Sequence, residues 1–435
     1  MIERYCTPEM TAIWSRQAKY QRWMEVEVAV CEEYHADGLL SEAEIAEIRS
    51  NAGFTLERCD ELEKETRHDL MAFVRNLSET IGPSSRWIHF GLTSYDVIDS
   101  ALGMMLRDSS QIVLEAVAEL DGAIEKLADE NADTPMIGRT HGIHAEPITF
   151  GFKLNGWRHE LSRSFDRFEA AKDEVSVGKI SGAVGIHAHV SPELEARILA
   201  RLGLKADPAA TQIVSRDRLA NLINQIALLG ASLEKFATEL RNLQRTEILE
   251  VQEAFASGQT GSSAMPHKRN PWNSETVAGL ARILRGNAMA MLESVSTWHE
   301  RDLTNSSVER IVLPDTFQLI HFMLRRLTRI VSELQVFPDR MMQNLKLMGD
   351  LVFSEHLMLK LIETGMQRHE AYKVVQRNAA KAWEGESFIE AIKADEDVKN
   401  RIQPEELQEL ISLGHHLRHS SSSRPQQSLS ERLHR

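Results

Sequence analysis

The chain has 435 residues, 42% hydrophobic and 26% charged, a composition typical of a globular protein of two or three domains. Its formal net charge of -14 argues against nucleic acid as a partner, because no long Lys/Arg segment precedes the last few residues. No window approaches the roughly 18 uninterrupted apolar residues of a membrane span, and the start lacks the apolar core of a secretory signal. We therefore expect a cytoplasmic protein that binds no membrane. Three cysteines without a CxxC pair indicate neither a disulfide framework nor a thiolate metal site.

Apolar residues recur mostly at helical spacing, and only 12 prolines and 23 glycines interrupt the chain, so we predict an all-α fold. An amphipathic helix is expected from Trp14 to Tyr34, ending at the turn Asp37-Gly38. Five longer stretches are expected to form a helical core, namely residues 94–131, 144–172, 215–255, 271–298 and 305–334. Ser215 is the candidate N-cap of the stretch that it begins. Because such helices overhang a single domain, burying their apolar stripes is expected to require other subunits.

The pattern predicts three domains: an N-terminal helical domain over residues 1–94, a central long-helix bundle over 95–345 and a C-terminal helical domain over 346–435. From about residue 415 the chain reads HHLRHSSSSRPQQSLSERLHR, which is polar and without periodicity. We predict that this tail is disordered.

A first stretch with chemical potential lies between residues 65 and 100, where His68 precedes the hydroxyl pair Thr93-Ser94. The pair falls at the start of a predicted long helix, where free N–H groups and the helix dipole favour a carboxylate. Such a pair can equally serve only as a helix cap.

A second stretch, GRTHGIHAEPITFG, spans residues 138–151 and contains Thr140-His141. Because the imidazole titrates near neutral pH, His141 is a candidate general acid. A metal site with His144 is the competing interpretation, but no nearby Asp, Glu or Cys completes a set such as HExxH. A purely structural histidine is a third interpretation.

The third stretch, SGQTGSSAMPHKRNP, covers residues 257–271 and lies between two predicted long helices. Its glycines permit close backbone approach, Ser262 and Ser263 offer hydroxyls, and Lys268 adds a charge, so this loop can wrap an anion. Asn270-Pro271 looks like the start of the next helix. The alternative is a mobile linker without a ligand.

The fourth stretch, ERDLTNSSVER, covers residues 300–310, where Arg301, Ser306 and Arg310 could converge on a phosphate through charge-assisted hydrogen bonds. Alternatively, these residues form a solvated helix face with local ion pairs.

The third stretch, GSSAMPHKRNP, resembles the signature loop of the fumarase/aspartase superfamily, whose members eliminate fumarate from substituted succinates. HGIHAEP is similar to the adenylosuccinate branch of that superfamily. The resemblance runs from about Arg4 to about Trp383 and includes IWSRQAKYQRWMEVE. It implies a long central helical bundle flanked by two smaller helical domains, and a homotetramer whose sites combine residues from more than one subunit.

By this resemblance, Ser262 is the base that removes the proton beta to the leaving nitrogen, and His141 is the acid that protonates that nitrogen. Glu275 is implied, by spacing, to hold His141, and His68 is a second candidate for contacting the departing amine. Lys268 and Asn270 are implied to hold the succinyl carboxylates. Further substrate contacts are implied for Arg4, Tyr5, Arg67, Asp69, Thr93, Ser94, Thr140, Gln212, Ser263, Met265, Arg301, Ser306 and Arg310.

The expected function is that of a lyase acting on adenylosuccinate and on the succinyl-carboxamide imidazole ribonucleotide of purine synthesis, by general base and general acid beta-elimination. No cofactor or metal is implied. The alternatives are another superfamily lyase, such as one for argininosuccinate, and a non-catalytic helical scaffold. Arg4, Arg301 and Arg310 favour a phosphorylated substrate, and intact Ser262 and His141 argue against a scaffold. Residues 258–265 are expected to be weakly ordered without ligand.

Overall fold

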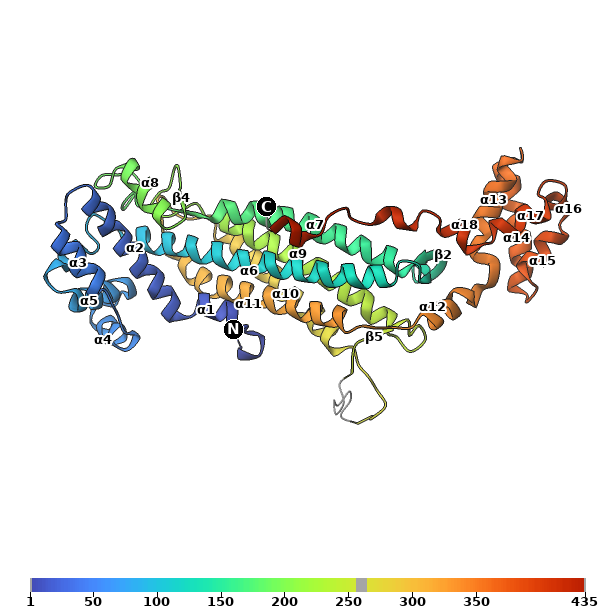
Figure 1. The fold of residues 1–435 in the computed structure, drawn as a ribbon, viewed down its shortest axis with the longest axis horizontal. Helices are drawn as coiled ribbons and strands as arrows, with labels where there is room; N and C mark the ends of the chain where they lie inside the picture. The colour runs from blue at the N-terminus through green and yellow to red at the C-terminus, as the bar shows by residue number, and fades with distance from the viewer. Residues whose placement is uncertain (1, 256–263, 434–435) are drawn as a thin grey trace. The chain divides into compact units, whose positions relative to one another are not determined.

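A computed structural model of the protein describes residues 2–255 and 264–433. Helices dominate this part of the chain and the strands are short, which confirms the predicted all-α fold class (Figure 1). The chain forms two compact units. The first comprises Met1–Val117, Arg163–Glu234 and Val277–Arg326, and the second comprises Ala118–Ser162, Lys235–Thr276 and Leu327–Arg435. Within residues 2–255 and 264–433, no helix has the length and apolar content that crossing a membrane requires.

The N-terminal part of the first unit consists of short helices around an aromatic core. The helix expected from Trp14 is interrupted at Ser15, which is extended and whose hydroxyl accepts a hydrogen bond from the N–H of Ala18 (3.1 Å). A serine in this conformation caps the following helix. The elements are η1 (Glu3–Tyr5), α1 (Pro8–Trp14), α2 (Arg16–Ala36), α3 (Glu42–Asn51), α4 (Leu56–Thr66), α5 (Asp69–Ile81) and η2 (Pro83–Trp87).

All five predicted long helices are present, with shifted ends. The helix predicted over residues 215–255 begins at Asp217, after the candidate N-cap Ser215, and it ends at Leu243, well before residue 255. Pro271, and not Asn270, precedes the helix that starts at Trp272, and its carbonyl accepts the N–H of Glu275 (3.0 Å). The helices are α6 (Ser94–Glu130), α7 (Phe150–Val175), α9 (Asp217–Leu243), α10 (Trp272–Glu293) and α11 (Thr304–Ser332), with α8 (Pro192–Arg201) between α7 and α9.

Polar contacts inside the first unit place parts of the five long helices side by side, as Figure 1 shows. The amine of Lys172 on α7 donates to Gln111 on α6 (2.9 Å), and Asn221 on α9 donates to Glu174 on α7 (2.7 Å). Arg285 on α10 pairs with Glu234 on α9 (2.6 Å). Asn287 on α10 also donates to Thr316 on α11 (2.9 Å). These contacts join neighbouring helices of one bundle.

Residues 135–149 form a β-hairpin, so the prediction of a helix from residue 144 is wrong. Strands β1 (Pro135–Thr140) and β2 (Ile143–Thr149) pair antiparallel, and α7 starts only at Phe150. The connecting residues His141 and Gly142 both have positive φ (55° and 79°), as a type I′ turn requires. Pro147 also disfavours a helix across this stretch, since it lacks an N–H donor. The other pairs are β3 (Val177–Gly178) with β4 (Lys205–Ala206), parallel, and β5 (Val251–Gln252) with β6 (Gln335–Val336), antiparallel.

The C-terminal part of the second unit is a group of short helices with its own apolar core. Leu357, Leu361, Ala371 and Phe388 belong to this core. The elements are α12 (Pro338–Leu345), η3 (Lys346–Phe353), α13 (Ser354–Glu363), α14 (Arg368–Trp383), α15 (Phe388–Ala394), α16 (Glu396–Lys399), α17 (Pro404–Leu410), α18 (Leu413–Leu417), η4 (Ser420–Ser423) and α19 (Leu429–Leu433).

Here the structure differs from the expectation of a disordered tail. Leu429 is 2% exposed, and its N–H donates to the carboxylate of Asp121 on α6 (3.1 Å). Arg424 pairs with Asp129 on the same helix (2.7 Å). One buried leucine and two partners on α6 hold a segment whose composition alone contains little apolar surface.

Candidate active site

The first unit brings Arg67, His68 and Asp69 to the junction between α4 and α5. Arg67 ends α4 in the left-handed conformation (φ 53°), and the Nδ1 of His68 accepts the N–H of Met71 (3.4 Å) as the N-cap of α5. A non-glycine residue at positive φ is uncommon and is usually held there by its surroundings. The local backbone therefore fixes the directions in which these side chains leave the chain.

Thr93 and Ser94 lie at the start of α6, next to this junction. The hydroxyl of Ser94 lies 3.5 Å from Nε2 of His68, so two predicted site residues that are 26 positions apart in sequence meet. The N–H of Thr93 donates to the carboxylate of Asp96 (2.8 Å), and the buried amine of Lys179 also bonds to Asp96. Thr93 therefore does not offer a free backbone donor, whereas the Ser94 hydroxyl faces the imidazole.

Arg310 on α11 reaches the same junction. Its Nη2 forms an ion pair with Asp69 (2.8 Å) across 241 residues of sequence, and the Arg310 side chain is 60% exposed. Because an exposed guanidinium keeps further N–H donors available, Arg310 can bind a phosphate in addition to the Asp69 carboxylate.

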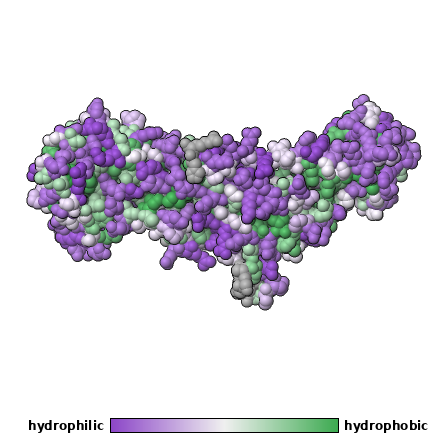
Figure 2. Space-filling view, viewed as in Figure 1, coloured by the Kyte–Doolittle hydropathy of each residue, from purple (hydrophilic) through white to green (hydrophobic). Residues whose placement is uncertain are grey.

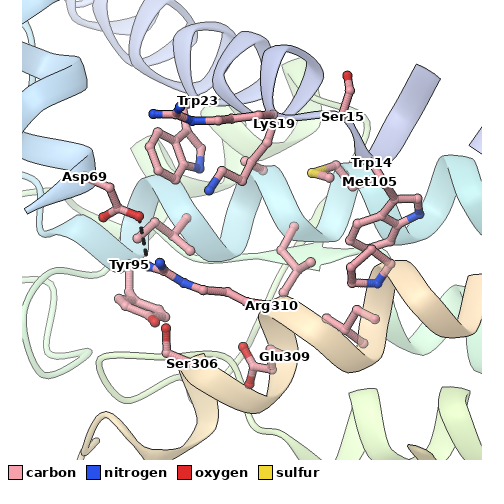
Figure 3. Close-up of a pocket in the computed structure, with 16 residues that line it drawn as sticks. Trp14, Ser15, Lys19, Trp23, Asp69, Tyr95, Met105, Ser306, Glu309 and Arg310 are labelled. Carbon is pink, nitrogen blue, oxygen red and sulfur yellow. Dashed lines mark hydrogen bonds and ion pairs between the residues drawn. The ribbon is translucent and has the colours of Figure 1, made fainter. Parts of the chain in front are cut away.

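Arg301 and Ser306 meet around a residue that the sequence analysis missed, Tyr95. The guanidinium of Arg301 lies 3.7 Å from the centre of the Tyr95 ring, and Nη1 of Arg301 donates to Gln212 (3.0 Å). The side chain of Ser306 lies beside the Tyr95 phenol (Figure 3). Gln212, Arg301 and Ser306 therefore form one group around an aromatic ring, whereas the sequence suggested Arg301, Ser306 and Arg310 for a phosphate site. The pattern TSYDV carried no signal for this role.

A cavity of about 310 Å³ lies in the first unit beside the pair of Asp69 and Arg310. Figure 3 shows Tyr95 and Ser306 at the same side of the cavity as this pair, with Lys19 pointing toward Asp69. Burial lowers the pKa of the Lys19 amine, and the charge of Arg310 lowers it further against the opposing effect of Asp69. The remaining wall is largely apolar and is formed by Trp14, Trp23, Ile98, Ala101, Leu102, Met105, Leu313 and Pro314.

Arg4 and Tyr5 lie in η1 of the same unit. Arg4 is exposed, and the Tyr5 ring packs edge-on against Phe322 of α11 with 5.2 Å between ring centres. The N-terminal turn is thus attached to α11, the helix that also carries Ser306 and Arg310.

In the second unit, Thr140 and His141 lie at the tip of the β1–β2 hairpin. His141 is exposed and occupies the first position of the turn. Close to this tip, Arg139 fixes β1 through two hydrogen bonds to the buried carboxylate of Glu250 (3.0 and 2.7 Å). Asn344 donates to the same carboxylate (2.9 Å). A rigid hairpin therefore presents the imidazole of His141 at its end.

His144, the second histidine of the competing metal-site interpretation, lies on β2. Its Nδ1 is buried without a hydrogen-bond partner in the described part of the chain, and burial together with the charge of Arg139 lowers its pKa. Among residues 2–255 and 264–433, no group of three His, Cys, Asp or Glu side chains is arranged to hold a metal ion.

The predicted signature loop is described only from Ala264 onward; Ser262 and Ser263 lie outside the described residues. Met265, Lys268 and Glu275 are exposed, and Asn270 is half-buried. The N–H of Lys268 donates to the carbonyl of Met265 (3.0 Å), which makes a local turn.

A buried glutamate before the loop, Glu253, fixes the segment that follows it. Its carboxylate accepts the N–H and the hydroxyl of Ser274 (2.8 and 2.5 Å) and the side chain of Asn273 (2.8 Å). A carboxylate at a helix N-terminus is stabilised by free N–H groups. Glu253 was not predicted, and a lone glutamate in a polar stretch gave no signal for this contact.

The predicted site residues therefore divide between the two units. Each unit contains some of these residues, and neither contains the full predicted set. The first holds Arg4, Tyr5, Arg67, His68, Asp69, Thr93, Ser94, Gln212, Arg301, Ser306 and Arg310, and the second holds Thr140, His141, Met265, Lys268, Asn270 and Glu275.

Comparisons with known proteins match nearly the whole chain. Residues 3–286 match the family described as Lyase, and residues 350–423 match Adenylosuccinate lyase C-terminus. An adenylosuccinate lyase from Synechocystis sp. is 49% identical over 419 residues, covering 96% of this chain and 97% of that protein. One from Bacillus subtilis is 46% identical with the same coverage. The structure of a fumarate lyase from Mesorhizobium sp. matches with a TM-score of 0.88 at 26% identity, covering 100% of this chain and 99% of that one. The C-terminal match extends beyond Trp383 into the polar tail.

Proposed function

The chain belongs to the adenylosuccinate lyase family, and from this premise we propose that it eliminates fumarate from adenylosuccinate, giving AMP, and from the succinyl-carboxamide imidazole ribonucleotide of purine synthesis. The observation that carries the proposal is the identity to adenylosuccinate lyases over nearly the full length of both chains. The arrangement of Gln212, Arg301 and Ser306 around Tyr95 supports a phosphorylated substrate.

The proposed reaction removes a proton from the carbon beta to the nitrogen and breaks the carbon–nitrogen bond. We assign the base to Ser262, because a hydroxyl can act this way where N–H donors and a cation stabilise its alkoxide. The electron pair of the broken C–H bond forms a carbanion, which spreads onto the adjacent carboxylate. This pair then becomes the carbon–carbon double bond of fumarate, while the pair of the carbon–nitrogen bond leaves with the nitrogen. His141 supplies the proton that the nitrogen takes up. Fumarate and the amine are the products.

We assign the succinyl carboxylates to Lys268 and Asn270, and to Ser94 beside His68. Cationic and hydroxyl donors aimed at a carboxylate stabilise the negative charge that develops on it in the transition state. We also assign His68 to contact with the departing amine, and its Nε2, which lies 3.5 Å from the Ser94 hydroxyl, supports this assignment by its position beside a proposed carboxylate contact. The pairing of Glu275 with His141 remains a prediction. No cofactor takes part in this scheme.

The phosphate is assigned to the cationic groups of the first unit. Arg301 and Arg310 are guanidinium groups with donors that match phosphate oxygens, and Ser306 adds a hydroxyl. We assign Arg4 and Tyr5 to the same end of the substrate and Arg67, Asp69, Gln212, Thr93, Thr140, Ser263 and Met265 to further contacts with it.

The test is an assay of purified protein with adenylosuccinate, in which fumarate and AMP should appear in equal amounts. Ser262→Ala and His141→Gln should each lower kcat by about 10³-fold, because each removes a proton-transfer group. His369→Gln changes an exposed histidine on α14 and serves as the control.

If the assembled wild-type protein releases no fumarate, the proposed function is wrong. A lyase for argininosuccinate would release fumarate from that substrate instead, and a helical scaffold would release none from either. The two alternatives therefore give different results in the same assay.

We also propose a cytoplasmic homotetramer. The first unit exposes large apolar side chains on its long helices, and Figure 2 shows apolar patches among the hydrophilic residues of the visible face. Subunit contacts commonly cover such surface. The exposed residues include Leu228 on α9, Ile283, Met289 and Leu292 on α10, and Ile311 on α11.

A further inference from the structure

We propose that Tyr95 is a positioning residue that makes the enzyme selective for a 5′-phosphorylated substrate by holding Arg301 and Ser306 in place. The inference rests on the proposed function, because that function assigns Arg301 and Ser306 to the phosphate. Tyr95 itself does not touch the ligand in this scheme. It acts through the two side chains that it orients, of which Figure 3 shows Ser306.

Arg301 stacks on the ring of Tyr95. Its guanidinium carbon lies 3.7 Å from the centre of the Tyr95 ring, well within the distance of an attractive cation–π contact. Gln212 accepts a hydrogen bond from Nη1 (3.0 Å), so the guanidinium is held on one face and at one edge. Its Nε has no hydrogen-bond partner in the described part of the chain. The group is oriented, yet it keeps donor capacity for an anion.

Ser306 is the second side chain beside Tyr95, and it lies next to the phenol (Figure 3). Ser306 is buried in the first turns of α11, where its hydroxyl could otherwise rotate to a backbone carbonyl. Burial raises the pKa of the Tyr95 phenol, which therefore keeps its proton at neutral pH. One side chain thus orients both a cation and a hydroxyl that are assigned to the same phosphate.

A cluster of buried charged side chains holds Tyr95 in place. The ring is 5% exposed, and Arg216 lies 5.9 Å from its centre. Arg216 is itself buried and forms paired hydrogen bonds to Asp99 (2.6 and 2.8 Å) and to Glu309 (2.8 and 3.1 Å). Buried ion pairs with full hydrogen bonding hold one arrangement rigidly. Glu309 also lies on α11, so the cluster ties Tyr95 on α6 to the helix that carries Ser306.

These contacts assign to Tyr95 an effect that simple packing would not have. A residue that only fills space would, when replaced, weaken the binding of all ligands alike. A residue that orients Arg301 and Ser306 would affect only ligands that carry a phosphate. The ratio of adenosine to AMP dissociation constants therefore separates the two roles.

The experiment measures the binding of AMP and of adenosine to the full-length assembled protein by titration calorimetry. Tyr95→Leu removes the ring and should reduce the AMP preference by about tenfold, the size of a desolvated cation–π contact. Tyr95→Phe keeps the ring and loses only the hydroxyl that lies beside Ser306, so the preference should fall by less, about two- to fivefold. Adenosine binding should stay within about twofold of the wild type.

Tyr34→Phe is the matched control, because Tyr34 is also 5% exposed in the first unit and also uses its hydroxyl, which donates to the carbonyl of Phe90 (2.9 Å). It should leave the AMP preference unchanged. A coupling test combines Tyr95→Leu with Arg301→Lys: since Tyr95 acts largely through Arg301, the second change should then add little. Should Tyr95→Leu not fold, Tyr95→Phe alone decides, through the same ratio.

An unchanged AMP preference in both Tyr95 variants, or an equal loss for AMP and adenosine, would overturn the inference. The same holds if wild-type protein binds AMP no more tightly than adenosine. These outcomes are distinct from a failure of the proposed function, which shows as a wild-type protein that does not release fumarate from adenylosuccinate. The binding ratio is measured without catalysis and stands in either case.

Discussion

The side chain of Arg310 is 60% exposed, and its ion-pair partner is remote in sequence. It pairs with Asp69, a residue 241 positions earlier, and not with an acidic neighbour on its own helix. The local alternative for this stretch, ion pairs along a solvated helix face, therefore does not describe Arg310. The pair leaves the guanidinium at the junction of α4, α5 and α6, beside the other predicted contacts.

Replacing Arg310 by Met should raise the KM for adenylosuccinate by about 10- to 100-fold and change kcat little. A charge-assisted contact to a group remote from the bond that breaks contributes mainly to binding in both ground and transition states. The measurement is steady-state kinetics with adenylosuccinate.

The control for this change is Arg329→Met on the same helix. Arg329 is exposed and pairs with Glu333 one turn later (3.2 Å), as an ordinary surface pair does. Equal kinetic effects of the two substitutions would contradict a specific role of Arg310.

At the scale of elements, the connection from η2 to α6 depends on one buried ion pair. His89 has positive φ (60°), and its N–H and Nδ1 both bond to the carboxylate of Glu27 on α2 (2.7 and 2.8 Å). Burial alone would lower the pKa of His89, but the hydrogen bond and the charge of Glu27 outweigh it, and the pKa is raised. The position of Thr93 and Ser94 follows from this connection.

Thermal stability should reflect this pair through pH. Because the folded-state pKa of His89 is raised, its contribution to stability is fully present below the unfolded value of about 6.5 and is lost as the pH rises through the folded value. The melting temperature of the wild type should therefore fall over this range relative to that of His89→Gln. Parallel pH profiles of the two proteins at the same protein concentration would show that the pair contributes nothing.

The C-terminal tail is the element for which sequence and structure differ most. Its Ser/Arg-rich composition predicts disorder, yet Leu429 is buried and the tail contacts Asp121 and Asp129 on α6. Asp121 also accepts a hydrogen bond from the buried Arg158 (3.0 Å). A few specific partners can order a segment that has little apolar surface of its own.

Leu429→Ala should release this tail. Truncating a buried leucine costs about 2 to 5 kcal/mol, and here the loss falls on a short segment with few other contacts. Hydrogen exchange of residues 424–433 should become faster by at least about tenfold, whereas the exposed control Ser430→Ala should leave it unchanged. Rapid exchange already in the wild type would support the original expectation of disorder.

At the scale of the whole molecule, the predicted site is divided between two sets of residues. His68, Ser94, Arg301 and Arg310 belong to the first unit, and His141 belongs to the second. The division agrees with the proposal that a tetramer builds each site from more than one subunit. The three predicted domains, with boundaries near residues 94 and 345, remain a prediction.

Mixing two inactive variants tests the shared site. His141→Ala and Ser262→Ala protein, each inactive alone, should regain fumarate release after they are unfolded together and reassembled, because some hybrid sites then receive an intact copy of both residues. Mixing without reassembly is the control. Hybrids that form but stay inactive would show that each site uses one subunit only.

The sequence by itself determined the helical class, the five long helices and the identity of the motifs, because helical periodicity and motif spacing are local properties of the chain. It could not determine where helices break. Ser15 interrupts the first predicted helix through its cap, and the hairpin at residues 135–149 replaces part of another, because pairing with β1 outweighs the apolar spacing of residues 144–149.

Only the tertiary structure decided which side chains meet. Tyr95 beneath Arg301, Asp69 beside Arg310 and Glu253 at the start of α10 join residues that are 20 to more than 200 positions apart. No local pattern encodes such contacts, since they depend on how helices pack and on which buried charges must find partners. For this reason the motif residues were recognised one by one in the sequence, whereas Tyr95 and Glu253, which hold them in place, were not.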